Sequence, residues 1–90
     1  MNLKNLHIYD ESIYSPDDKF IQIRHISYWS LTEADWIYQN ENGHVSQHDI
    51  CYVERKPYGD TFEYIQTPIR FEDIPQYVLD YLYSHGYKHI

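Results

Sequence analysis

The pattern of hydrophobic and polar positions is helical only near the end of the chain. From Asp73 onward, hydrophobic side chains recur at spacings of three and four residues, which places them on one face of a helix. The face consists of Ile74, Tyr77, Val78, Tyr81, Leu82 and His85. Asp73 is a suitable N-cap, Pro75 is tolerated in a first helical turn, and Gly86 is a suitable residue to end the helix. The sequence therefore predicts one amphipathic helix between Asp73 and Gly86.

Upstream of this helix, the pattern has the period of β-strands. Alternating or β-branched segments predict strands at residues 6–9, 19–30, 36–39, 44–55 and 61–66. Within 19–30 the alternation changes phase near His25, which predicts a bulge or a strand that crosses between two environments. An interruption of the segment 44–55 at Gln47-His48 is left open.

Turn residues separate the predicted strands. Pro16 in Ser15-Pro16-Asp17-Asp18 presets the φ angle of a type I turn, and we expect the aspartates to cap the turn backbone. Asn42-Gly43 tolerates the positive φ of a tight hairpin, and Gly59 lies in a further turn. Short turns between strands, followed by a helix, predict an α+β fold: an antiparallel β-meander of about four or five strands with one C-terminal helix packed on one face. We expect the opposite face, lined by tyrosines, to be exposed.

Composition bounds the classes of function that this chain can have. Ninety residues predict one domain, residues 1–90, with a shallow core. The chain has 14 acidic and 7 basic residues, for a net charge of −7, and 18% of it is aromatic, including eleven tyrosines. Nucleic-acid-binding domains neutralise phosphates with lysine and arginine, so the acidic charge disfavours direct binding. If the chain did bind nucleic acid directly, it would do so through a sheet face of aromatic residues, flanked by lysine and arginine, on which RNA bases stack.

Location and cofactors are predicted mainly from motifs that the sequence lacks. No run approaches the roughly 18–20 apolar residues of a membrane span, and the first residues do not resemble a signal peptide. A single cysteine fits a reducing compartment, so we expect a cytoplasmic location, in a bacterial cell or a phage-infected host. Phosphate-binding loops and catalytic serine motifs do not occur in the sequence. We expect a protein without enzymatic activity and without a cofactor.

One segment combines potential metal ligands with a thiol. His44, His48, Asp49 and Cys51 follow one another closely. Histidines four residues apart on a strand are separated by about 13 Å, which is too far to chelate one ion without a bend. Cys51 lies in an apolar strand, where a free cysteine is usually a small buried hydrophobe. We therefore expect no metal site here. A small metal- or thiol-dependent enzyme that uses these residues is the least favoured of three hypotheses about function, and the other two follow.

The preferred hypothesis rests on acids that alternate with aromatic residues. Tyrosine and tryptophan dominate binding hot spots, and acids around them attract a basic partner. The predicted aromatic anchors are Tyr28, Trp29, Trp36, Tyr38 and Tyr58, and the predicted acidic contacts are Asp35, Glu41, Asp60 and Glu63. The sequence thus predicts a small acidic, non-enzymatic inhibitor that occludes the site of a larger, basic, nucleic-acid-handling protein. Its carboxylates would act as a nucleic-acid mimic, in positions that phosphates normally occupy.

The chain contains no motif of a known family. Its size, acidic charge and single cysteine are similar in type to those of phage-encoded anti-defence proteins, such as anti-CRISPRs, and of immunity proteins and antitoxins that neutralise toxins. No residues are transferred from this similarity, because no motif carries it. The alternative function is a structural or assembly module that self-associates, for instance as a homodimer, through the exposed aromatic sheet face.

Overall fold

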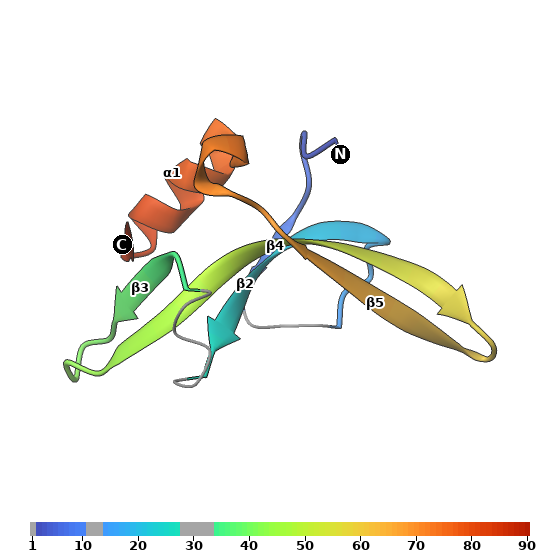
Figure 1. Cartoon of the computed structure of the whole chain (residues 1–90), viewed down its shortest axis with the longest axis horizontal. Coiled ribbons are helices and arrows are strands. Elements are labelled where there is room, and N and C mark those ends of the chain that lie inside the picture. Colours follow the sequence, from blue (N-terminus) through green and yellow to red (C-terminus); the bar gives the residue numbers. More distant parts are fainter. Residues whose placement is uncertain (1, 11–13, 28–33) are drawn as a thin grey trace.

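The computed structural model describes residues 2–10, 14–27 and 34–90. These residues form one sheet of six strands, a short 3-10 helix and one α-helix (Figure 1). The strands are β1 (Ile8–Asp10), β2 (Lys19–Ile26), β3 (Trp36–Gln39), β4 (Val45–Tyr58), β5 (Thr61–Pro68) and β6 (Tyr87–His89). The helices are η2 (Phe71–Asp73) and α1 (Gln76–Ser84). The α+β class is therefore confirmed.

The long strand β4 is the centre of the sheet. β2 pairs antiparallel along one edge of β4, whereas β3 and β5 share the other edge, opposite residues 45–48 and 51–58 respectively. Because neighbouring strands bond to β4 along its whole length, it runs without the interruption left open at Gln47-His48. The predicted turn residues Gly43 and Gly59 have positive φ angles of 79° and 60° at the two hairpins.

The predicted antiparallel meander is wrong at both ends of the sheet. β1 adds to β2 in parallel, with Ile8 opposite Ile21, and β6 returns after the helix to pair with β3. Each of these strands has only three residues, and an alternating pattern this short does not predict which strand it pairs with or in which direction. The order β1-β2-β4-β3-β6, with β5 beside β4, makes a mixed sheet.

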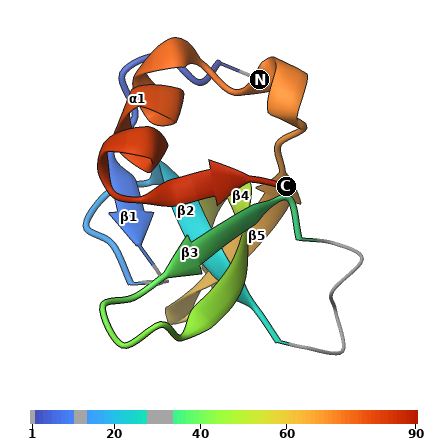
Figure 2. The ribbon, with the colours of Figure 1, turned by 90° about the vertical axis from the view of Figure 1, so that its left-hand side faces the viewer.

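The sheet curls into a half-barrel, and α1 lies on its open side, above β1 and β6 in the view of Figure 2. The main core is formed by side chains of the inner sheet face, of α1 and of the segment that connects β5 to α1: Ile21, Ile23, Trp36, Ile50, Tyr52, Ile69, Ile74, Val78, Leu82 and Tyr87. The prediction of one C-terminal helix packed on one face is confirmed. The helix begins at Gln76, later than predicted, because Ile74 precedes a proline and is extended, with ψ of 121°.

The opposite face of the sheet is not the exposed aromatic surface that the sequence predicts. Phe20, Cys51 and Val53 are buried there, and the rings of Tyr9 and Tyr64 pack against them. We call this group the second core. Adjacent residues of β2 are thus buried on both faces, which removes the alternation from that part of the sequence. The register from Lys19–Glu54 to Ile26–Gln47 is regular, so the predicted phase change does not mark a bulge within β2.

A polar network adjoins the second core. The guanidinium of Arg24 donates hydrogen bonds to both carboxylate oxygens of Asp49, from Nε to Oδ1 at 3.0 Å and from Nη2 to Oδ2 at 2.6 Å. Gln66 accepts a hydrogen bond from Arg24 and donates one of 2.6 Å to Gln22. The side chain of Asp49 is 3% exposed, so its charge is stabilised by this bidentate ion pair rather than by water.

Candidate partner-binding surface

The β4–β5 hairpin projects beyond the rest of the molecule, to the right in Figure 1. β2 stops pairing with β4 at Glu54, so no third strand among the described residues pairs with the hairpin tip. We call residues 56–63 the arm. Pro57 has no N–H to donate, and proline is tolerated in a strand only at an edge of this kind. Every residue of the arm is exposed, so the arm adds little to either core.

The arm brings together three of the predicted site residues, Tyr58, Asp60 and Glu63. Tyr58 is 69% exposed, and Asp60 lies in the tight turn beside it. Phe62 is 51% exposed and was missed, because its alternation with Tyr64 suggests a strand face packed on a core. The guanidinium of Arg55 lies 4.6 Å from the centroid of the Phe62 ring. The arm therefore presents two large aromatic side chains to solvent.

The charge of the arm is close to balance. It carries Asp60 and Glu63 against Lys56, which lies opposite Glu63 in the pairing register. Elsewhere, Asp18 pairs with Arg55, and Asp73 pairs with Arg70. Most of the net charge of −7 is therefore distributed away from the arm, and the arm itself does not present an acidic array.

The other predicted site residues lie apart from the arm. Trp36 is 1% exposed, so its prediction as a surface anchor is wrong: its ring packs between His89 and Tyr83 and belongs to the main core. Asp35 is exposed just before β3, and Glu41 is exposed in the β3–β4 turn, at the opposite end of Figure 1 from the arm. Two other predicted anchors, Tyr28 and Trp29, lie outside the described residues.

The last of the predicted anchors, Tyr38, lines a pocket of about 300 Å³ with Asp10, His85 and Tyr87. The hydroxyl of Tyr87 donates a 2.7 Å hydrogen bond to Asp10, and the rings of Tyr38 and Tyr87 lie 5.1 Å apart. Tyr81 stacks on His85 at the same end of α1, and burial, together with the charge of Asp10, raises the pKa of Tyr81. Sequence reasoning named only Tyr38, because the other residues come from β1, β6 and the helix end.

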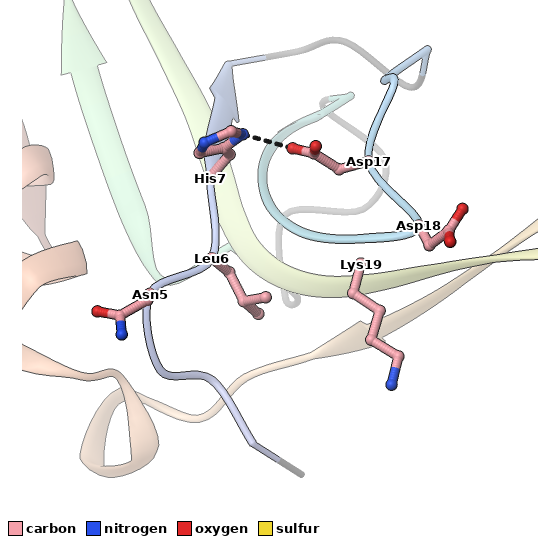
Figure 3. A pocket seen from close by; sticks show the side chains of 6 residues that line it. All are labelled: Asn5, Leu6, His7, Asp17, Asp18 and Lys19. Atoms are coloured by element: carbon pink, nitrogen blue, oxygen red, sulfur yellow. Dashed lines mark hydrogen bonds and ion pairs between the residues drawn. The ribbon is translucent and has the colours of Figure 1, made fainter.

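A second pocket, of about 400 Å³, lies beside the β1–β2 connection (Figure 3). Nδ1 of His7 and Oδ2 of Asp17 face each other there and are hydrogen-bonded, and Tyr9 donates a 2.9 Å hydrogen bond to Asp17. That hydrogen bond is the main cause that lowers the pKa of Asp17, and His7 lowers it further. The expected self-capping of this turn by aspartate is replaced by Ser15, whose hydroxyl accepts from the Asp17 backbone N–H. The pairing holds the connection against β1.

The potential metal and thiol residues in and just before β4 do not converge. His44 is exposed, whereas His48 and Cys51 are buried on opposite faces of the sheet. The predicted burial of Cys51 is confirmed, and its thiol lies 3.6 Å from Asp49. In the described part of the chain, no three histidine, cysteine or acidic side chains are placed to hold a metal ion. The single α-helix described is too short to span a membrane.

Comparison with known protein families, with curated proteins and with solved structures found no match to this chain.

Proposed function

We propose that this chain is a non-enzymatic inhibitor that docks its arm into a site of a larger, basic, nucleic-acid-handling protein. The observation that carries the proposal is the exposure of Tyr58 and Phe62 on an element that projects beyond both cores. Large aromatic side chains bury much area at low entropic cost, which is why they dominate binding hot spots. Asp60 and Glu63 flank these rings and would contact cations of the partner.

The partner is proposed to be basic because of the net charge of −7. A charge of this size attracts a basic protein and raises its association rate, and salt screens the attraction. Since the arm has only two acids, we propose occlusion by shape and aromatic contact, with charge acting mainly on association. The anti-defence and immunity types of inhibitor both fit this mode of action, within the cytoplasm of a bacterial or phage-infected cell.

A binding experiment with matched variants tests this proposal. The partner is first captured from host lysate and purified, and its dissociation constant is then measured at low and high salt. We expect the double variant Tyr58→Ala/Phe62→Ala to bind at least about tenfold more weakly, as hot-spot loss predicts. Val45→Ala is the control, because Val45 is 54% exposed but lies at the other end of β4. If the arm variant binds as tightly as wild type, the arm is not the docking element.

Inhibition itself needs a separate measurement. Anisotropy of a labelled nucleic acid bound to the purified partner would report whether the site is occluded. We expect wild-type protein to displace the nucleic acid and the arm variant to require at least about tenfold higher concentration. Simultaneous binding of the protein and the nucleic acid would contradict the occlusion mechanism while leaving the docking element intact.

The outer edge of β5 favours self-association as a second candidate function. Within the described residues, no strand pairs with the far side of Thr61–Pro68, and Glu63 is its only charged side chain. Unprotected edges of this kind pair readily with other strands. A homodimer would then form through the β5 edge rather than through an aromatic sheet face. Sedimentation that shows a monomer at high concentration would contradict this candidate.

A further inference from the structure

The pocket that contains Tyr38 has the groups needed to bind a cation. It lies where the ends of β1 and β3, the start of β6 and the end of α1 meet, on the left in Figure 2. Tyr87 is 4% exposed and contributes a buried wall, whereas Asp10 and His85 are exposed. Its volume of about 300 Å³ is at the lower end of the range for ligand pockets. The pocket therefore suits a side chain better than a large ligand.

The carboxylate of Asp10 is oriented before any ligand binds. Its Oδ2 accepts the 2.7 Å hydrogen bond from Tyr87, and Oδ1 accepts none from the described residues. No lysine or arginine is among the described residues that line the pocket. Asp10 can therefore pair with a cation without giving up its bond to Tyr87.

Aromatic rings lie beside this carboxylate. The rings of Tyr38 and Tyr87 are 5.1 Å apart, and the ring of Tyr38 lies close to Gly86. Both rings line the pocket together with Asp10 and His85. Faces of tyrosine rings attract cations, and more strongly where water is excluded.

We propose that this pocket binds the guanidinium group of an arginine side chain presented by a protein partner. Arginine is favoured over lysine because its planar guanidinium can stack on a tyrosine ring while its N–H groups bind a carboxylate. The pocket lies at the opposite end of the molecule from the arm, so it is a second contact, distinct from the one proposed above. It goes beyond the proposed function and can be tested without the partner.

NMR titration with short blocked peptides tests this proposal. The probe is a peptide with one arginine, and the control peptide carries citrulline, which has the same shape without the charge. We expect the arginine peptide to shift the ring signals of Tyr38 and Tyr87 and to saturate at millimolar concentration. Asp10→Asn should weaken this binding about fivefold to tenfold, because it removes the charge but keeps an oxygen for Tyr87. Asp80→Asn, an exposed acid on α1, should leave the binding unchanged.

Several outcomes would overturn the proposal. Equal binding of the citrulline peptide, or no shifts at the pocket, would exclude a cation site, and equal binding of a lysine peptide would exclude a preference for guanidinium. If Asp10→Asn disturbs the fold, Tyr38→Leu provides the same test, because it keeps bulk but removes the aromatic face. Since these titrations use no partner, their failure is distinguishable from failure of the arm variants to lose partner binding.

Discussion

The hydroxyl of Tyr87 donates a 2.7 Å hydrogen bond to Oδ2 of Asp10, although 77 residues separate the two. This bond joins β6, the last strand, to β1, the first, across the open side of the half-barrel. Tyr87 is 4% exposed and belongs to the main core, whereas Asp10 is exposed. The bond therefore links the interior to a charged group at the surface and holds the two sheet ends together.

We expect Tyr87→Phe to lower the free energy of unfolding by about 1–2 kcal/mol, because it removes only a hydrogen bond to a charged acceptor. Urea denaturation followed by fluorescence would measure the change. Tyr83→Phe is the control: Tyr83 is 52% exposed, and no hydrogen bond of its hydroxyl is found among the described residues. A loss as large in Tyr83→Phe as in Tyr87→Phe would mean that the bond to Asp10 contributes nothing specific.

Removal of one partner of the Arg24–Asp49 ion pair should destabilise the fold strongly, whereas replacement of both partners by apolar residues should destabilise it much less. We expect Arg24→Met to lower the free energy of unfolding by about 3–5 kcal/mol, because it leaves the nearly buried carboxylate of Asp49 without its counter-charge. The double variant Arg24→Met/Asp49→Leu should recover much of that loss, since neither charge remains. Urea denaturation of both variants provides the measurement. A double variant no more stable than Arg24→Met would contradict this account.

The lowered pKa of Asp17 predicts how its interactions depend on pH. Because the folded pKa lies below the unfolded one, the carboxylate contributes stability above about pH 4, and that stability is lost as pH falls through the folded pKa. Tyr9→Phe should raise the pKa of Asp17, because the Tyr9 hydrogen bond is the main cause of its lowering. The substitution keeps the contact between the rings of residue 9 and Phe20. NMR titration of the side-chain carboxyl would measure this pKa. Tyr14→Phe is the control, and an equal shift there would contradict the assignment.

The thiol of Cys51 should be unreactive in the folded protein. Its relative exposure is 0%, and only a thiolate that reagents can reach reacts readily. We expect no labelling by a disulfide reagent in native buffer and one equivalent in guanidinium chloride. Rapid labelling of the native protein would contradict the burial of Cys51 and would restore the thiol-dependent hypothesis.

Local chemistry in the sequence determined the hairpins and the helix. Asn42-Gly43 and Gly59 specify positive φ at two tight turns, so β3, β4 and β5 could be predicted with nearly their observed bounds. The apolar spacing from Ile74 to Leu82 likewise determined which face of α1 is buried. These features depend on neighbours within a few residues, which is why a single sequence is enough to predict them. Net charge and the burial of Cys51 were also evident from the sequence.

Only the tertiary structure decided which aromatic residues are core and which are surface. Trp36 and Tyr58 each lie near an aspartate in the sequence, but Trp36 belongs to the main core, whereas Tyr58 lies on the arm, where β2 no longer pairs with β4. The partners of β1 and β6 depend on pairing between residues far apart in the chain, and three-residue strands have no period to predict it. The Asp10 pocket exists for the same reason: the curl of the sheet brings together elements from opposite ends of the sequence.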